Sequence, residues 1–96
     1  MEDLLAQVIK RANRYINEMQ TRRVSPSPGD IANLQGLNVP LQDDPIDPAT
    51  VLAELDNIAS PATVASTGGR FFGFVIGGCL PAPMAVNMLA GVWDQI

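Results

Sequence analysis

The sequence contains no histidine, and its 96 residues include one cysteine and one lysine. Without histidine, Cys79 has no partner that would activate it as a nucleophile, and a zinc site lacks its usual ligands. A single cysteine excludes an intramolecular disulfide framework and is typical of a reducing compartment. We therefore expect no catalytic residue, no metal site, a packing role for Cys79 and a cytoplasmic location.

Long apolar runs and concentrated basic charge are also missing. No stretch approaches the roughly 18 uninterrupted apolar residues of a membrane span, and Glu2 and Asp3 stand where a signal peptide has basic residues. The net charge is -4, whereas phosphate neutralisation needs a concentrated basic face. We expect partners that are neither nucleic acid nor membrane.

The charges are distributed unevenly along the chain. Five of the six basic residues lie before residue 24, and most of the acidic residues lie between residues 30 and 56. This asymmetry would allow one segment to dock on another, or one subunit on its neighbour. We favour the simpler interpretation, in which these charges cover solvated helix faces.

Apolar periodicity and capping signals predict a mostly α fold with three to four helices. The first segment repeats apolar residues at helical spacing. Ser27 with Pro28, and Asp47 with Pro48, are typical of helix starts, and Pro81 belongs in the first turn of a last helix. The predicted helices span residues 3–21, 28–36, 48–59 and 81–96.

The glycine-rich stretch before the last helix carries aromatic and β-branched residues, which favour a short extended segment over residues 70–77. One strand alone leaves its backbone groups unpaired, so it would require a sheet or a neighbouring subunit. Gly77 and Gly78 precede a helix, where free amides attract anions. We favour backbone crowding at a tight turn over an anion site.

The end of the chain carries no signal that closes the last helix. The sequence finishes within an apolar segment at Ile96, and Asp94 stands at the unfavourable pole of the helix dipole. A chain of this length buries only about two thirds of its unfolded surface. We therefore expect a truncated segment that forms an intertwined homo-oligomer.

Several short motifs together resemble the N-terminal portion of the group II pyridoxal-phosphate-dependent decarboxylases, a family that includes aromatic-amino-acid, tyrosine and glutamate decarboxylases. The resemblance covers most of the chain and is most specific from Ser60 to Gln95. The motifs are Tyr15-Ile16, Arg23-Val24-x-Pro26-x-Pro28-Gly29, Asp47-Pro48, Ile58-Ala59-Ser60-Pro61-Ala62-Thr63 and Arg70-Phe71-Phe72-Gly73-Phe74.

The resemblance implies a homodimeric enzyme whose N-terminal helices pack across the dimer axis. It also implies that Phe74, Val75, Ile76 and Gly77 would line the substrate pocket of a complete enzyme. Their apolar character would favour an aromatic or aliphatic substrate over glutamate, and plain packing is an equally good interpretation of Phe74 and Val75.

The sequence departs from the family in two ways. Gly68-Gly69 stands where the family often has a His-Pro pair before the aromatic residues. The Schiff-base lysine, the histidine that stacks on pyridoxal phosphate and the carboxylate that pairs with its pyridinium nitrogen belong to the family's large domain, which this sequence does not include. The one lysine, Lys10, is expected on a solvated helix face.

Two functional hypotheses follow from the residues and the resemblance. In the first, residues 1–96 are a single N-terminal dimerisation segment that associates with itself, has no enzyme activity alone and binds no cofactor. In the second, the chain forms part of an amino-acid carboxy-lyase that a separate large domain completes. A small-ligand binder that uses the Gly77-Gly78 turn ranks third, because fold resemblance alone does not confer function.

Overall fold

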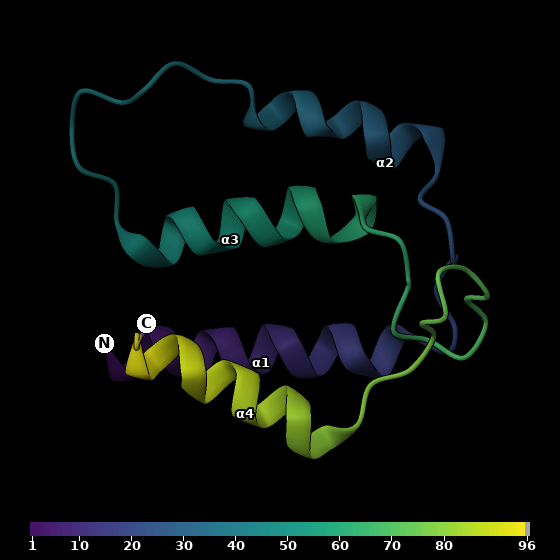
Figure 1. The fold of residues 1–96 in the computed structure, drawn as a ribbon. Coiled ribbons are helices and arrows are strands. Elements are labelled where there is room, and N and C mark those ends of the chain that lie inside the picture. Colours follow the sequence, from purple (N-terminus) through teal and green to yellow (C-terminus); the bar gives the residue numbers. More distant parts are fainter. Residues whose placement is uncertain (96) are drawn as a thin grey trace.

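A computed structural model describes residues 1–95 as four α-helices joined by turns and loops, with no strand in that range (Figure 1). The mostly α fold class is confirmed. The helices are α1 (Glu2–Glu18), α2 (Pro28–Ala32), α3 (Pro48–Ala59) and α4 (Pro81–Trp93). Two 3-10 turns, η1 (Asn33–Leu37) and η2 (Ser60–Ala62), extend α2 and α3.

The first helix follows the apolar periodicity of the sequence. Its half-buried residues include Leu4, Val8, Ala12 and Tyr15, which recur at spacings of three and four and so share one face. This face packs against α3. The helix ends at Glu18 rather than at residue 21, and the chain then turns towards the prolines at 26 and 28.

The second and third helices begin where their proline and capping signals predict. At α2, the Ser27 side chain accepts a hydrogen bond from the Asp30 amide at 3.1 Å. The Asp30 carboxylate in turn accepts one from the Ser27 amide at 3.2 Å, which makes a reciprocal capping box. At α3, Pro48 occupies the first turn after Asp47, and the helix spans the predicted residues 48–59.

The predicted extended segment over residues 70–77 is wrong. The chain turns repeatedly there: the Phe71 amide donates to the Gly68 carbonyl and the Ile76 amide to the Gly73 carbonyl. Phe74 and Val75 have φ of 55° and 58°, in the left-handed region. A lone strand would have left its amides unpaired, and local turns satisfy some of them instead.

The last helix does have a closing residue. Asp94 adopts the left-handed conformation (φ 51°, ψ 49°) and donates its amide to the Ala90 carbonyl, so α4 ends at Trp93 rather than at residue 96. Aspartate tolerates this conformation better than most residues, although glycine and asparagine are the residues that usually close a helix. Residue 96 lies outside the described residues.

The helices form an open arrangement with very little core. In Figure 1, α3 lies between α2 and α1, while α4 runs along the opposite side of the molecule from α2. Met19 and Ala65 are the only apolar side chains buried among residues 1–95. The radius of gyration is 15.3 Å, against about 12.5 Å for a compact domain of this length. The single chain therefore leaves most of its apolar surface uncovered.

Candidate functional site

An apolar groove lies between α1 and α3. Its volume is about 440 Å³, and Met84 of α4 also contributes to its lining. The apolar wall consists of Val8, Ala12 and Ile16 from α1 and Leu52, Leu55 and Ala59 from α3. The groove exists because the two helices bring their apolar stripes together at one side and leave them open at the other.

An ion-pair cluster joins the two helices at the side of the groove. Asp56 of α3 accepts hydrogen bonds from Arg11 at 2.8 Å and from Arg14 at 2.9 Å, both on α1. Arg11 also donates to the Asn57 side chain at 3.2 Å. The interpretation of Arg11 and Arg14 as charges on a solvated helix face is therefore wrong. Their ion pairs with Asp56 hold one segment of the chain against another, as the uneven charge distribution allowed.

A second polar cluster closes the same groove at the C-terminal end of α1. The Tyr15 hydroxyl lies 2.7 Å from the Thr63 hydroxyl oxygen. The Thr63 hydroxyl donates its one proton to the Ser60 carbonyl at 2.8 Å, so the Tyr15 hydroxyl is the donor in its hydrogen bond with Thr63. Arg22 lies over the Tyr15 ring at 4.9 Å and donates to the Ser60 carbonyl at 2.9 Å.

The connection after α1 is fastened to residues far along the chain. The Ala65 amide donates to the Val24 carbonyl at 2.8 Å, and Arg70 donates to the carbonyls of Met19 and Arg22. Met19 and Ala65, the two buried apolar residues, both take part in these long-range contacts. Tyr15, Thr63 and Arg70, which belong to three separate motifs of the family resemblance, thus meet in one region.

The predicted substrate-pocket residues do not join the groove. Phe74, Val75 and Ile76 are exposed, with Phe74 at 91% and Val75 fully accessible, and Gly77 is half-buried. None of these four residues lines the groove between α1 and α3. Within this chain they form an exposed turn, and only a further domain or subunit would make them a pocket wall.

The structure supports the interpretation of Gly77 as a residue required by backbone crowding, and it contradicts the packing role of Cys79. A Cβ at Gly77 would lie 2.6 Å from the Phe71 carbonyl oxygen, which supports backbone crowding as the reason for this glycine. The start of α4 offers few amides to an anion, because Pro81 has no N–H and the Met84 amide donates to the Leu80 carbonyl. Cys79 is exposed, so the predicted packing role is wrong.

The groove itself was not predicted from the sequence, although the apolar periodicity of the first segment predicted the stripe that forms its α1 wall. Periodicity places residues on a helix face but does not say which faces meet. Comparisons with family models, with curated proteins and with solved structures found no match to this chain.

The helices of residues 1–95 are all too short or too polar to cross a bilayer. Within the same range, no three acidic or cysteine side chains come together as a metal site would require. The chemistry that the described residues do offer is apolar contact, flanked by polar groups that already have partners. Such a surface is suited to binding another protein surface.

Proposed function

We propose that this chain is a self-associating N-terminal segment of the kind that the group II pyridoxal-phosphate-dependent decarboxylases carry, without enzyme activity of its own. Its principal partner is a second copy of itself, and its place is the cytoplasm. Residues 1–96 act as one unit whose helices pack across the axis of the oligomer. The motif resemblance supports the family, and the surface of the chain supports the association.

The extent of exposed surface carries this proposal. The chain exposes 7727 Å², whereas a compact monomer of this mass exposes about 5300 Å². The excess of about 2400 Å² per chain is of the order that obligate dimers bury in their interfaces. Phe72, Leu80, Val92 and Trp93 are among the large apolar residues that remain accessible. Surfaces of this kind rarely stay in water.

Sedimentation velocity over a concentration series, with circular dichroism on the same samples, tests the association. We expect a helical dimer or higher oligomer at micromolar concentration. A monodisperse, helical monomer throughout the series would contradict the proposal. Replacement of the exposed Gln42 by alanine, in the connection between η1 and α3, is a control that should leave the sedimentation profile unchanged.

The residues present do not fit pyridoxal phosphate within this chain. Lys10, the one lysine, is exposed on the polar face of α1, and the chain has no histidine to stack on the cofactor ring. We therefore assign no cofactor to the chain alone. Added pyridoxal phosphate should produce neither an aldimine absorbance band nor a shift in melting temperature.

A second candidate is a role as part of an amino-acid carboxy-lyase that a separate large domain completes. The exposed turn of Phe74, Val75 and Ile76 favours it, because these side chains are free to meet another domain. An adjoining reading frame that encodes the family's lysine and histidine cofactor motif would support this candidate. Decarboxylation by the two purified chains together, and by neither alone, would establish it, and an inactive mixture would count against it.

A further inference from the structure

We propose, on the basis of the self-association above, that α4 of one copy seats in the groove between α1 and α3 of a second copy, and reciprocally. The contacting ridge on α4 is formed by Val86, Leu89 and Trp93. The groove wall that receives it includes Ile16 and Leu55, which are 44% and 52% exposed. The partner at this surface is thus a second copy of this chain, and the element that enters is an apolar helix.

The fourth helix has the composition of a buried helix but is not buried in its own chain. Its 13 residues contain no charged side chain, and each of them is exposed except Met84, which is half-buried. A helix that is apolar around its circumference is normally covered on all sides. Val86, Leu89 and Trp93 have exposed fractions of 56%, 48% and 59%. Their spacing of three and four residues is that of anchors for a groove.

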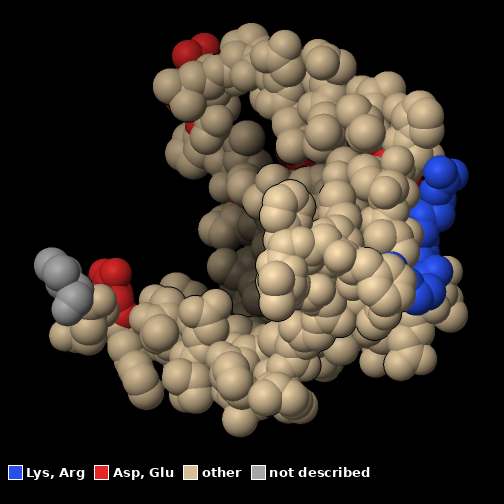
Figure 2. Space-filling view, turned by 45° about the vertical axis from the view of Figure 1, so that its right-hand side comes forward, with Lys and Arg blue, Asp and Glu red and all other residues tan. Residues whose placement is uncertain are grey.

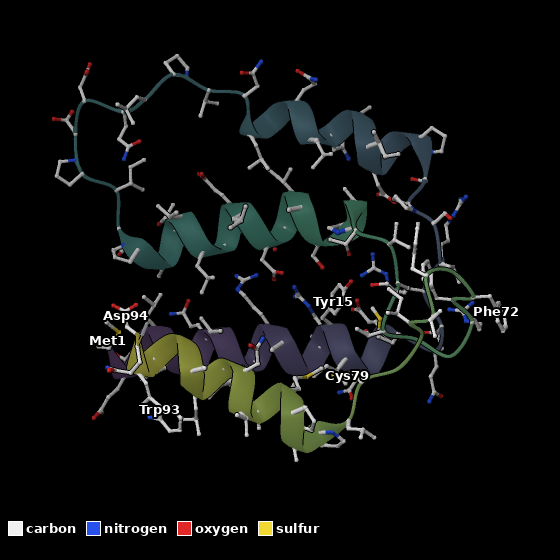
Figure 3. All side chains as sticks on the ribbon, in the orientation of Figure 1. Met1, Tyr15, Phe72, Cys79, Trp93 and Asp94 are labelled. Carbon is white, nitrogen blue, oxygen red and sulfur yellow. The ribbon has the colours of Figure 1, made fainter. Side chains whose placement is uncertain are left out.

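The ridge cannot enter the groove of its own chain while α4 stays where it is. Met84 faces that groove, and at about 100° per residue the ridge residues lie on roughly the opposite side of the helix. Figure 3 shows Trp93 pointing away from α1. The free ridge must therefore be covered by something outside the chain.

Most polar side chains along the groove already have hydrogen-bond partners. Of the polar side chains along it, Arg11, Tyr15, Asp56 and Thr63 already bond to one another or to neighbours in the same chain, whereas Ser60 does so only through its carbonyl. Among the described residues, no buried side-chain nitrogen or oxygen lacks a partner. Among these side chains, an entering apolar ridge thus removes only the hydration of the Ser60 hydroxyl, whereas an entering charged segment would lose its own hydration.

The shape of the molecule allows the exchange to be mutual. Figure 2 shows a hollow that opens to one side, with an arm below it. Nearly all the surface around this hollow is free of charged side chains in that view. Two such molecules related by a two-fold axis can place each arm in the hollow of the other, which closes the assembly as a dimer.

Cysteine cross-linking between differently tagged chains tests this arrangement. Both chains carry Cys79→Ser; one carries Leu55→Cys in the groove and the other Leu89→Cys on the ridge. The control pair replaces Leu55→Cys with Glu54→Cys, which is exposed next to it on α3. With diamide as oxidant, we expect the Leu55 and Leu89 pair to form the mixed disulfide at least about tenfold faster, because contact raises the effective concentration.

Trp93 provides a second measurement on the unaltered chain, since it is the sole tryptophan. Its emission should shift to shorter wavelength over the same concentration range in which the sedimenting mass doubles. Persistent monomers in sedimentation would overturn the proposed function. Dimers in which the mixed disulfide forms no faster than the control, and in which Trp93 emission does not shift, would overturn only the placement of α4.

Discussion

At the scale of single residues, Asp56 is the main connection between the two helices that form the groove. Its carboxylate forms ion pairs with both Arg11 and Arg14. The Asp56 side chain is 21% exposed and the Arg11 side chain is 23% exposed. Arg14 is more than half exposed, so water screens its share of the interaction. Asp56 therefore holds α1 on α3 chiefly through Arg11.

Replacing Asp56 with asparagine should lower the free energy of unfolding by about 1 kcal/mol, because it removes the charge that two arginines share. Urea unfolding followed by circular dichroism measures the change. The matched control is Glu54→Gln on the same helix, whose side chain is exposed and which should leave the midpoint nearly unchanged. Equal midpoints for the two variants would show that the ion pairs contribute nothing.

Asp30 gives the start of α2 a dependence on pH. Hydrogen bonds from the side chain and then the backbone of Ser27 lower its pKa, and Arg23 and Arg22 act in the same direction. A carboxylate with a lowered native pKa stabilises the fold above its unfolded value of about 3.9. That contribution is lost as the pH falls through the lowered native pKa.

We therefore expect the Asp30→Asn variant to be less stable than the parent protein at neutral pH. The two should be equally stable at a pH low enough to protonate Asp30 in both the folded and the unfolded protein. Urea midpoints measured between pH 7 and pH 2 would follow the difference. Carboxyl titration by NMR should place the Asp30 pKa below the ordinary aspartate value. An ordinary pKa, with a difference between variants that does not change with pH, would rule out this account.

At the scale of elements, the turn between η2 and α4 is the most unusual part of the chain. Two bulky residues, Phe74 and Val75, have positive φ there, and Gly77 has φ of 141°. Val75 is β-branched, and such residues rarely occupy the left-handed region. The turn is held by hydrogen bonds within residues 68–76 and by the glycine that lets the chain pass close to Phe71.

Gly77→Ala should loosen this turn, because a Cβ would lie 2.6 Å from the Phe71 carbonyl oxygen and φ is unfavourable for alanine. A cost of about 1 kcal/mol or more would speed hydrogen exchange at the Ile76 amide at least about fivefold. Gly78→Ala is the matched control, since nothing lies within 4 Å of its Cβ position. Similar exchange in both variants would remove the crowding argument.

At the scale of the whole molecule, stability and association are expected to be one process. The single chain buries only Met19 and Ala65 among its described apolar side chains. In the proposed oligomer, contacts between copies would supply most of the favourable burial. For proteins of this kind, the folded monomer contributes little by itself.

We expect the melting temperature to rise with protein concentration. For a dimer that unfolds to two chains, each tenfold increase adds about 1.4 kcal/mol to the free energy of unfolding per mole of dimer. Calorimetry over a hundredfold range would show the shift. A melting temperature independent of concentration would mean that the single chain is the stable unit.

The sequence by itself determined the features that depend on near neighbours. The helix start at Ser27 and Pro28 and the span of α3 were predicted because their signals lie within a few residues of the structure they produce. The mostly α fold class followed from the same local patterns. The end of α4 was misjudged because Asp94 is not the residue that usually closes a helix.

Only the tertiary structure decided which distant residues meet. Arg11 and Asp56 are 45 positions apart, and Tyr15 and Thr63 are 48 apart, so no local pattern reports their contact. The left-handed turn at Phe74 and Val75 also depended on what lies around it, because a residue pattern that favours extension needs a neighbouring strand to realise it. The groove between α1 and α3 exists for the same reason: helix periodicity defines each wall, and the packing of the two helices brings the walls together.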